Sequence, residues 1–243
     1  MAERIQSEHP IHGTGEAIPQ AQLVRDAQRI LDVVASGGVA VIPLDVAYAI
    51  VGGTDGAIRR IFTAKNRSYE KPSGLFSSPL FSDEIHDLTP EKRAMIHEII
   101  REENLPFSVV ASFNPQHRFF GRVDPFVLEH SSKQGTIDML LNAGSLHNEL
   151  VKLSWDAGIP VFGSSANTSL MGSKYRADDI ESAVLDAADL VIDYGLSKYH
   201  NPHGRSSTII DFSDFSVIRI GVCFDQLKEA FHTRFGVRLQ VKQ

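Results

Sequence analysis

Three cations lie close together in one polar segment, where they could bind an anion. Lys65, Arg67 and Lys71 fall within seven residues, shortly before Pro72. Lysine supplies a mobile point charge, and arginine supplies a planar fork that matches a phosphate or a carboxylate. Taken alone, such a segment is more often a solvated basic turn.

Two further polar segments adjoin apolar ones. Residues 163–169 read Gly-Ser-Ser-Ala-Asn-Thr-Ser after the apolar run 159–162, and residues 205–211 lead from Arg-Ser-Ser-Thr into Ile-Ile-Asp. Small hydroxyl and amide side chains let a ligand approach the backbone and offer many hydrogen-bond partners. Separately, each segment also fits a Ser/Asn turn or the polar start of an edge strand.

Other kinds of site lack their sequence signals. No two of the ten histidines have the i, i+4 spacing of a helical zinc site. The single cysteine, Cys223, excludes an intramolecular disulfide and argues against a cysteine metal site. We find no Walker A loop, dinucleotide-binding glycine motif or Gly-x-Ser-x-Gly elbow, and we predict no metal-ligating residue.

Length and charge set the broad class. The 243 residues fit one large domain, and the formal charge of −6 argues against broad nonspecific binding to nucleic acid. No apolar run approaches the roughly 20 residues that a bilayer span needs, and the polar start of the chain lacks a secretory signal. We therefore expect a cytoplasmic protein without a membrane partner. Residues 1–20 are predicted to be a flexible N-terminal segment, and residues 21–243 a single domain.

Alternating patterns predict an α/β fold. Helical periodicity or capping residues predict helices over 21–35, 54–64, 90–101, 145–157, 178–187 and 226–235. Apolar or β-branched runs predict strands over 39–42, 47–51, 75–78, 107–113, 135–141, 159–162, 190–193, 207–212 and 215–220, with 114–134 irregular. Alternation of this kind favours a sheet with parallel segments, and the last two strands should add an antiparallel hairpin.

The order of the polar segments resembles the YrdC-like family, which includes threonylcarbamoyl-adenylate synthases. That family shows Pro-Thr-Asp-Thr-x-Tyr-Gly-Leu, then Lys-x-Arg with a later Pro, Ser-Ala-Asn-x-Ser, Ser-Thr-(Ile/Val)-(Ile/Val)-Asp and Arg-x-Gly. Here the corresponding residues are 43–50, 65–67 with Pro72, 165–169, 207–211 and 219–221. The resemblance covers roughly residues 21–225.

The resemblance implies a fold and a reaction. The fold would be a YrdC-like twisted mixed sheet with flanking helices around a large concave cavity. The reaction would join an amino acid, bicarbonate and ATP into a carbamoyl adenylate with release of pyrophosphate, and ATP chemistry usually brings Mg²⁺. Catalytic roles would fall to Lys65 and Arg67. Nucleotide contacts would come from Lys65, Arg67, Ser165, Asn167, Ser207 and Arg219.

The departures from the family pattern fall in the predicted substrate pocket, which comprises Leu44, Val46, Tyr48 and Leu140. Leu44 and Val46 stand where the family has threonines, and Ala49 where it has glycine. The family's strand Gly-Thr-(Val/Ile)-Gly-Val-Arg-x-Pro corresponds to residues 135–142, with Leu140 in place of the arginine. The family's Pro-x-Pro-x-Thr segment is not recognisable near residues 113–121, although Arg118 and Arg122 add cations there. A site that loses hydrogen-bond partners for a polar ligand loses selectivity for it.

Three functions stay open at this point. The first is an ATP-using enzyme that acts on an amino acid other than threonine or on a carbamoyl donor. The second is threonylcarbamoyl-adenylate synthesis for tRNA modification. The third is a non-catalytic module that binds nucleotide or double-stranded RNA. The sequence fixes neither the substrate nor the oligomeric state.

Overall fold

The computed structural model describes residues 2–6 and 18–241. One mixed sheet runs through the described chain in the order β1-β9-β2-β3-β8-β4-β7-β5-β10-β11-β12, with β6 paired to β7. Its strands are Glu3–Gln6 (β1), Ala40–Ile42 (β2), Ala49–Gly52 (β3), Gly74–Ser77 (β4), Phe107–Ser112 (β5), Ser132–Lys133 (β6), Thr136–Leu141 (β7), Phe162–Ser165 (β8), Leu190–Asp193 (β9), Ile209–Asp211 (β10), Ser216–Arg219 (β11) and Gln240–Val241 (β12). The predicted twisted mixed α/β fold is confirmed.

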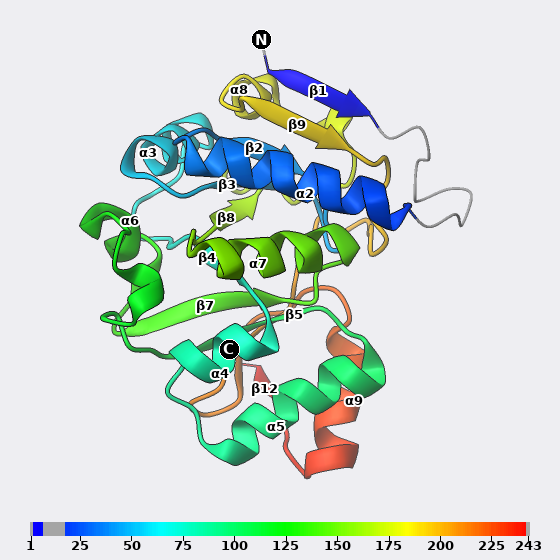
Figure 1. Cartoon of the computed structure of the whole chain (residues 1–243). Helices are drawn as coiled ribbons and strands as arrows, with labels where there is room; N and C mark the ends of the chain where they lie inside the picture. Colours follow the sequence, from blue (N-terminus) through cyan, green and yellow to red (C-terminus); the bar gives the residue numbers. More distant parts are fainter. Residues whose placement is uncertain (1, 7–17, 242–243) are drawn as a thin grey trace.

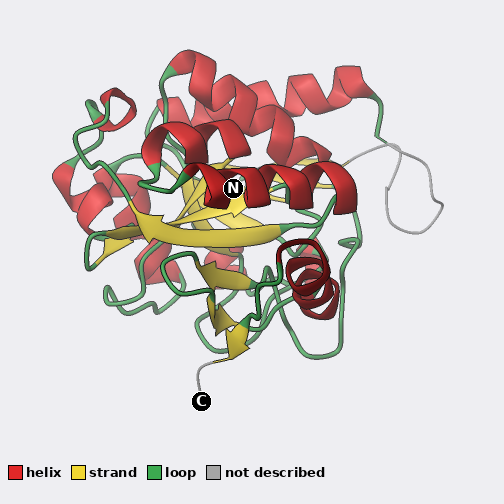
Figure 2. Cartoon of the chain, turned by 90° about the horizontal axis from the view of Figure 1, so that it is seen from below, coloured by secondary structure: helices red, strands yellow, loops and turns green. Residues whose placement is uncertain are grey.

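The helices flank this sheet. They are Gln20–Ala35 (α2), Asp55–Ala64 (α3), Pro79–Ile85 (α4), Pro90–Glu98 (α5), Pro125–Glu129 (α6), Ser145–Ala157 (α7), Ser182–Leu185 (α8) and Phe224–Phe235 (α9). Single turns of other helix types cover Ile99–Glu103, Arg118–Phe120 and Ala177–Asp179. Helices α2 and α7 pack side by side across the strands in Figure 1, and Figure 2 shows the sheet from below with helices above it.

Capping residues place several helices where the sequence predicts them. The hydroxyl of Thr54 accepts a hydrogen bond from the backbone N–H of Ala57 at the start of α3. Thr89 does the same for Lys92 at the start of α5, with Pro90 at the first helical position. Helix α7 ends at Gly158, whose φ of 65° is the left-handed conformation that favours glycine.

Several expectations need correction. Residues 3–6 were expected to be flexible, but they form β1, which pairs with β9 in parallel; residues 7–17 lie outside the described part. The strand predicted over 159–162 lies instead at Phe162–Ser165. The segment expected to be irregular, 114–134, holds α6 and β6, while the helix predicted over 178–187 shortens to α8 after one tight turn.

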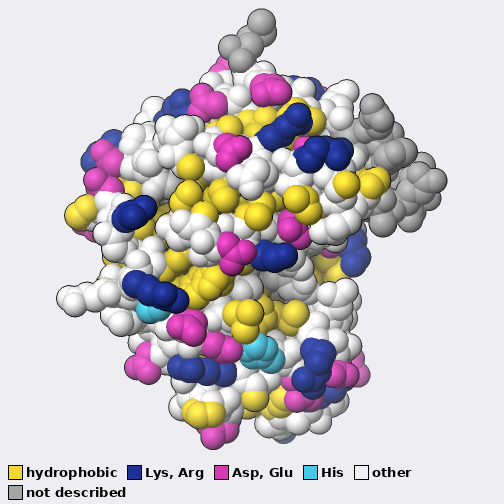
Figure 3. Space-filling view, in the orientation of Figure 1, with side chains coloured by type: hydrophobic (Ala, Val, Ile, Leu, Met, Phe, Trp, Pro, Cys, Tyr) yellow, Lys and Arg dark blue, Asp and Glu magenta, His cyan; other side chains and the backbone are white. Residues whose placement is uncertain are grey.

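The molecular surface carries mixed charge. On the face shown in Figure 3, basic and acidic side chains are interspersed over the helices. Within the described residues, no helix has both the length and the apolar character that a membrane span requires.

The antiparallel hairpin of β10 and β11 is confirmed, and its return segment packs closely against its own start. The backbone N–H of Gly221 donates to Thr208 Oγ1 at 3.0 Å, and Thr208 Oγ1 donates to the carbonyl of Val222 at 2.9 Å. A Cβ atom at Gly221 would overlap the backbone of Ser206 and Ser207. Only glycine therefore lets the two segments approach this closely.

We predict that Gly221→Ala destabilises the protein by about 1–3 kcal/mol or more, as overpacking against backbone atoms does. Gly56→Ala is the control, because a Cβ there meets nothing within 4 Å at the exposed start of α3. That control should be neutral or should stabilise by up to about 1 kcal/mol. Urea unfolding of both variants measures the difference, and equal stabilities would contradict the close packing.

Candidate binding pocket

A cavity of about 130 Å³ lies where the central strands meet the loop after α3 and the β10–β11 hairpin. Its walls are lined by Leu44, Ala47, Tyr48, Ala49, Arg67, Pro72, Gly74, Phe76, Ser108, Asp138, Leu140, Gly163, Ser164, Ser165, Ser206, Ser207, Ile209 and Arg219. The three polar segments noted in the sequence thus contribute to one hollow.

Arg67 enters the cavity from the loop after α3. Its Nε donates to the carbonyl of Lys71 at 3.1 Å, and its Nη2 donates to the carbonyl of Pro72 at 2.7 Å. The loop therefore holds the guanidinium through its own backbone. Burial, together with the nearby charge of Arg219, lowers the pKa of Arg67 to about 10.

Arg219 enters from β11 and is held by Ser207. Its Nε and Nη2 donate to the Ser207 carbonyl at 3.0 and 2.8 Å, and Nη2 also donates to Ser207 Oγ at 3.0 Å. The side chain keeps an exposed surface, yet protein surrounds it because that surface faces the hollow. Burial lowers the pKa of Arg219, and the charge of Asp138 partly offsets that effect.

Lys65 does not line the cavity, although the resemblance places it beside Arg67 as a phosphate ligand. Its side chain is 1% exposed. Its Nζ donates to the carbonyl of Ser165 and, at 2.5 Å, to the carbonyl of Asn167. Lys65 thus fixes the loop that forms one cavity wall.

The two polar residues predicted in that loop differ in position. Ser165 lines the cavity. Asn167 is buried behind it, and its Nδ2 donates to the carbonyl of Thr168 at 2.6 Å. The structure therefore brings Arg67, Ser165, Ser207 and Arg219 together, and leaves Lys65 and Asn167 in a second layer. Their roles toward a nucleotide stay predictions.

Three of the four predicted substrate-pocket residues line the cavity, namely Leu44, Tyr48 and Leu140. Val46 does not; it is 1% exposed within the core. The hydroxyl oxygen of Tyr48 lies 2.8 Å from both Asp193 Oδ1 and the carbonyl oxygen of Gly195, and these two acceptors share its one proton. It is therefore held by the end of β9.

Four polar cavity residues were not among the predicted site residues, namely Ser108, Asp138, Ser164 and Ser206. In β7, exposure alternates along residues 136–141, with Ile137, Met139 and Leu141 buried. This alternation was a usable signal, because it places Asp138 on the same face as Leu140. Burial raises the pKa of Asp138 to about 6, against the opposing effects of the Arg219 charge and a hydrogen bond from Ser108.

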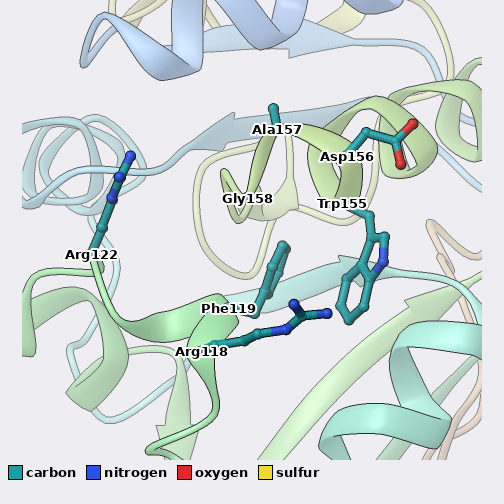
Figure 4. A pocket seen from close by; sticks show the side chains of 7 residues that line it. All are labelled: Arg118, Phe119, Arg122, Trp155, Asp156, Ala157 and Gly158. Carbon is teal, nitrogen blue, oxygen red and sulfur yellow. The ribbon is translucent and has the colours of Figure 1, made fainter.

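Arg118 and Arg122 do not join this cavity. They line a separate hollow of about 520 Å³ with Phe119 and the end of α7 from Trp155 to Gly158. Figure 4 shows Arg118 extending toward Trp155 while Arg122 points away. The two hollows share no lining residue.

No group of three or more His, Cys, Asp or Glu side chains that could hold a metal ion occurs among residues 2–6 and 18–241. The lining instead offers guanidinium groups and hydroxyls, which suit phosphate or carboxylate oxygens.

Fold and cavity together define an α/β protein with a hollow on a mixed sheet that is lined by arginine and serine side chains. The family model Sua5_yciO_yrdC, described as telomere recombination, matches residues 32–221. The chain belongs to this Sua5/YciO/YrdC family, as the sequence resemblance predicted. No curated protein sequence matches the chain.

Solved structures share the fold. A hypothetical protein, smu.1377c from Streptococcus mutans UA159, is 20% identical with a TM-score of 0.76, and the match covers all of both chains. Sua5 from P. abyssi, crystallised with L-threonine, is 19% identical with a TM-score of 0.69; all of this chain matches 62% of that one. E. coli YciO is 20% identical with a TM-score of 0.64, over 91% of this chain and 97% of that one.

The burial of Lys65 should make the stability of the protein depend on pH. Burial and the charge of Arg67 lower its pKa to about 7, whereas a lysine in the unfolded chain titrates near 10.4. Between these values the unfolded state binds more protons, so stability should rise with pH. From pH 7 to 10, we expect wild type to gain free energy of unfolding relative to Lys65→Met.

Lys71→Met serves as the control for this measurement, because Lys71 is an exposed lysine on the same loop. Its difference from wild type should stay constant over the same pH range. Urea unfolding at several pH values provides the comparison. Parallel curves for wild type and Lys65→Met would show that the ammonium of Lys65 is not desolvated.

Proposed function

We propose that this protein is an ATP-dependent enzyme that forms a carbamoyl adenylate from bicarbonate and a small amino compound other than threonine. The observation that carries the proposal is the meeting of Arg67 and Arg219 with the hydroxyls of Ser165 and Ser207 in one cavity. Family membership supports it, since the family includes carbamoyl-adenylate-forming enzymes. Two proteins of similar fold were solved with relevant ligands: Sua5 with L-threonine, and HypF in a phosphate- and nucleotide-bound form.

The proposed chemistry needs no nucleophilic side chain. The amine and bicarbonate condense to a carbamate with loss of water. A carbamate oxygen then attacks the α-phosphorus of ATP, and pyrophosphate leaves as the new P–O bond forms. Negative charge develops on the phosphate oxygens, so fixed guanidinium groups stabilise the transition state more than the ground state. Arg67 and Arg219 are already held by backbone carbonyls and need little reorganisation.

A substrate other than threonine follows from the cavity walls. Leu44 lines the cavity at a position where the family pattern has threonine, and Leu140 lines it where the pattern has arginine. Each change removes a hydrogen-bond donor from the wall. Threonylcarbamoyl-adenylate synthesis for tRNA modification remains the nearest enzymatic alternative, and rescue of a cell that lacks its own synthase would favour it.

A non-catalytic role is the second candidate, in which the protein binds a nucleotide or double-stranded RNA. One observation favours it: the family's lysine, Lys65, is buried against carbonyls and does not reach the cavity. Saturable binding without turnover would be its mark. Binding to RNA would weaken steeply with salt, because counterions are released from the phosphates.

Pyrophosphate release with ATP, bicarbonate and a panel of amino compounds, threonine included, tests the proposal. We expect release with at least one compound. Arg67→Ala and Arg219→Gln should each reduce the rate about tenfold or more, as for the loss of a charge-assisted contact of ~1.5–3 kcal/mol. Release by no member of the panel would contradict the enzymatic proposal.

The control for this assay is Arg118→Gln, which removes the same charge from the separate hollow beside Trp155. Its rate should match wild type. An equal loss in Arg118→Gln and Arg219→Gln would mean that the cavity between β7 and the β10–β11 hairpin is not where ATP reacts.

A further inference from the structure

Asp138 is a half-buried acid in the binding cavity, and one of its two carboxylate oxygens has no partner. It lies in the middle of β7, and its side chain lines the hollow together with Leu140. Its Oδ1 is buried and accepts no hydrogen bond. None of the ion pairs within the described residues includes it. A buried carboxylate oxygen without a partner is costly, so its presence calls for an explanation.

The surroundings of Asp138 leave room for a ligand group. Across the sheet, Gly74 of β4 has no side chain, and even a Cβ atom there would lie 3.4 Å from Oδ2. On the other side, Ser108 of β5 lies between Asp138 and Ser207, with the two serine hydroxyls 3.3 Å apart. The other titratable side chains that line the cavity are Arg67, Arg219 and Tyr48.

Charge at the cavity wall differs from the family pattern by two units. That pattern has glycine at position 138 and arginine at position 140, whereas this chain has aspartate and leucine. One negative charge has been gained and one positive charge lost. With Arg67 and Arg219, the walls carry two positive charges and one negative charge. A small ligand with both an anion and a cation satisfies all three, whereas a ligand that bears only negative charge leaves Asp138 unpaired and repelled.

The dimensions of the hollow agree with a small substrate; ATP would bring only its reacting phosphate to the two arginines and keep its nucleoside outside the hollow. About 130 Å³ is well below the roughly 300–1,000 Å³ of pockets that enclose drug-sized molecules. Leu44, Phe76 and Leu140 supply apolar wall between the charged groups. A short carbon chain with a charged group at each end matches this arrangement.

We propose that Asp138 is a specificity residue that binds the protonated amine of a small substrate, whose carboxylate faces Arg67 and Arg219. This inference rests on the proposed function in one respect only, namely that the bound amino compound is the carbamoyl acceptor. For that reaction the bound ammonium first gives up a proton, to Asp138 or to water, and the neutral amine then condenses with bicarbonate. The recognition itself needs neither ATP nor turnover. It can therefore be tested by binding alone.

Three five-carbon carboxylates separate the possible sources of the amine. L-norvaline carries only an α-amine, 5-aminopentanoate carries only a terminal amine, and pentanoate carries none. Isothermal titration calorimetry at pH 7.5, without nucleotide and with a chelator, compares their affinities for wild-type protein. We expect at least one amine to bind about tenfold or more tightly than pentanoate, and the better amine identifies which position Asp138 contacts.

Asp138→Asn should abolish this preference while the affinity for pentanoate stays equal or rises, because the amide keeps the shape and loses the charge. Asp156→Asn is the matched control, since it removes a carboxylate from the separate hollow. It should keep the preference of wild type. Circular dichroism checks that each variant is folded. A second measurement on wild type needs no variant: the preference should shrink from pH 7.5 to 5.5, because protonation of Asp138 occurs near its pKa of about 6.

Several results would overturn the inference. These are equal binding of all three compounds to wild type, an amine preference that survives in Asp138→Asn, or Mg²⁺ alone binding to wild type and not to that variant. The two proposals fail separately. Pyrophosphate release without an amine preference removes the role of Asp138, and an amine preference without pyrophosphate release removes only the enzymatic reaction.

Discussion

The guanidinium of Arg219 rests on Ser207, and this contact organises one side of the cavity. It donates hydrogen bonds to both the carbonyl and the hydroxyl of Ser207, and these bonds link β11 to the start of β10. The same hydroxyl lies beside Ser108, which faces Asp138 from the next strand. Gly221 makes the contact possible, because the return segment of the hairpin runs directly over Ser206 and Ser207. The Arg-x-Gly motif thus has one residue for charge and one for close approach.

Two like charges share the hollow, and they oppose each other. Arg67 and Arg219 each meet a carbonyl partner, yet the charge of Arg219 still lowers the pKa of Arg67. Because protein surrounds both guanidinium groups, this repulsion is screened less than it would be in bulk water. An anion placed between the two guanidinium groups would relieve this repulsion, and the relief would add to the affinity for that anion. Asp138 relieves only some of the repulsion, because it makes no ion pair with either arginine.

Much of the fold was predictable because local signals agreed with tertiary packing. Helix α7 matches its predicted range of 145–157, and β9 matches 190–193. Helices α4 and α6 were missed, although Ser78-Pro79 and Asp124-Pro125 carry the same cap-and-proline pattern that revealed α5. The shift of β8 to residues 162–165 has a different cause. The register of β8 is set by its hydrogen bonds to β3 and β4. The apolar character of residues 159–161 indicates that they are packed inside the protein, but it does not show that they form a strand.

The sequence indicated which residues form the site better than it indicated where their side chains point. Order and spacing indicated that Arg67, Ser165, Ser207 and Arg219 would meet, and they line one cavity. Nothing local could show that Lys65 would turn toward carbonyls about 100 residues away in the chain. Asp138 is different, since the alternation of apolar and polar residues in β7 already placed it on the face of Leu140.

The edge strand β1 is connected to the cavity wall through a chain of side-chain contacts. Arg4 of β1 pairs with Asp193 at 2.7 Å, and Asp193 Oδ1 lies 2.8 Å from the hydroxyl oxygen of Tyr48, a residue of the cavity wall. Any shortened or tagged version of the chain that loses residues 3–6 would leave Tyr48 anchored by a carboxylate without its counterion. Experiments on ligand recognition should therefore keep the N-terminal strand in place.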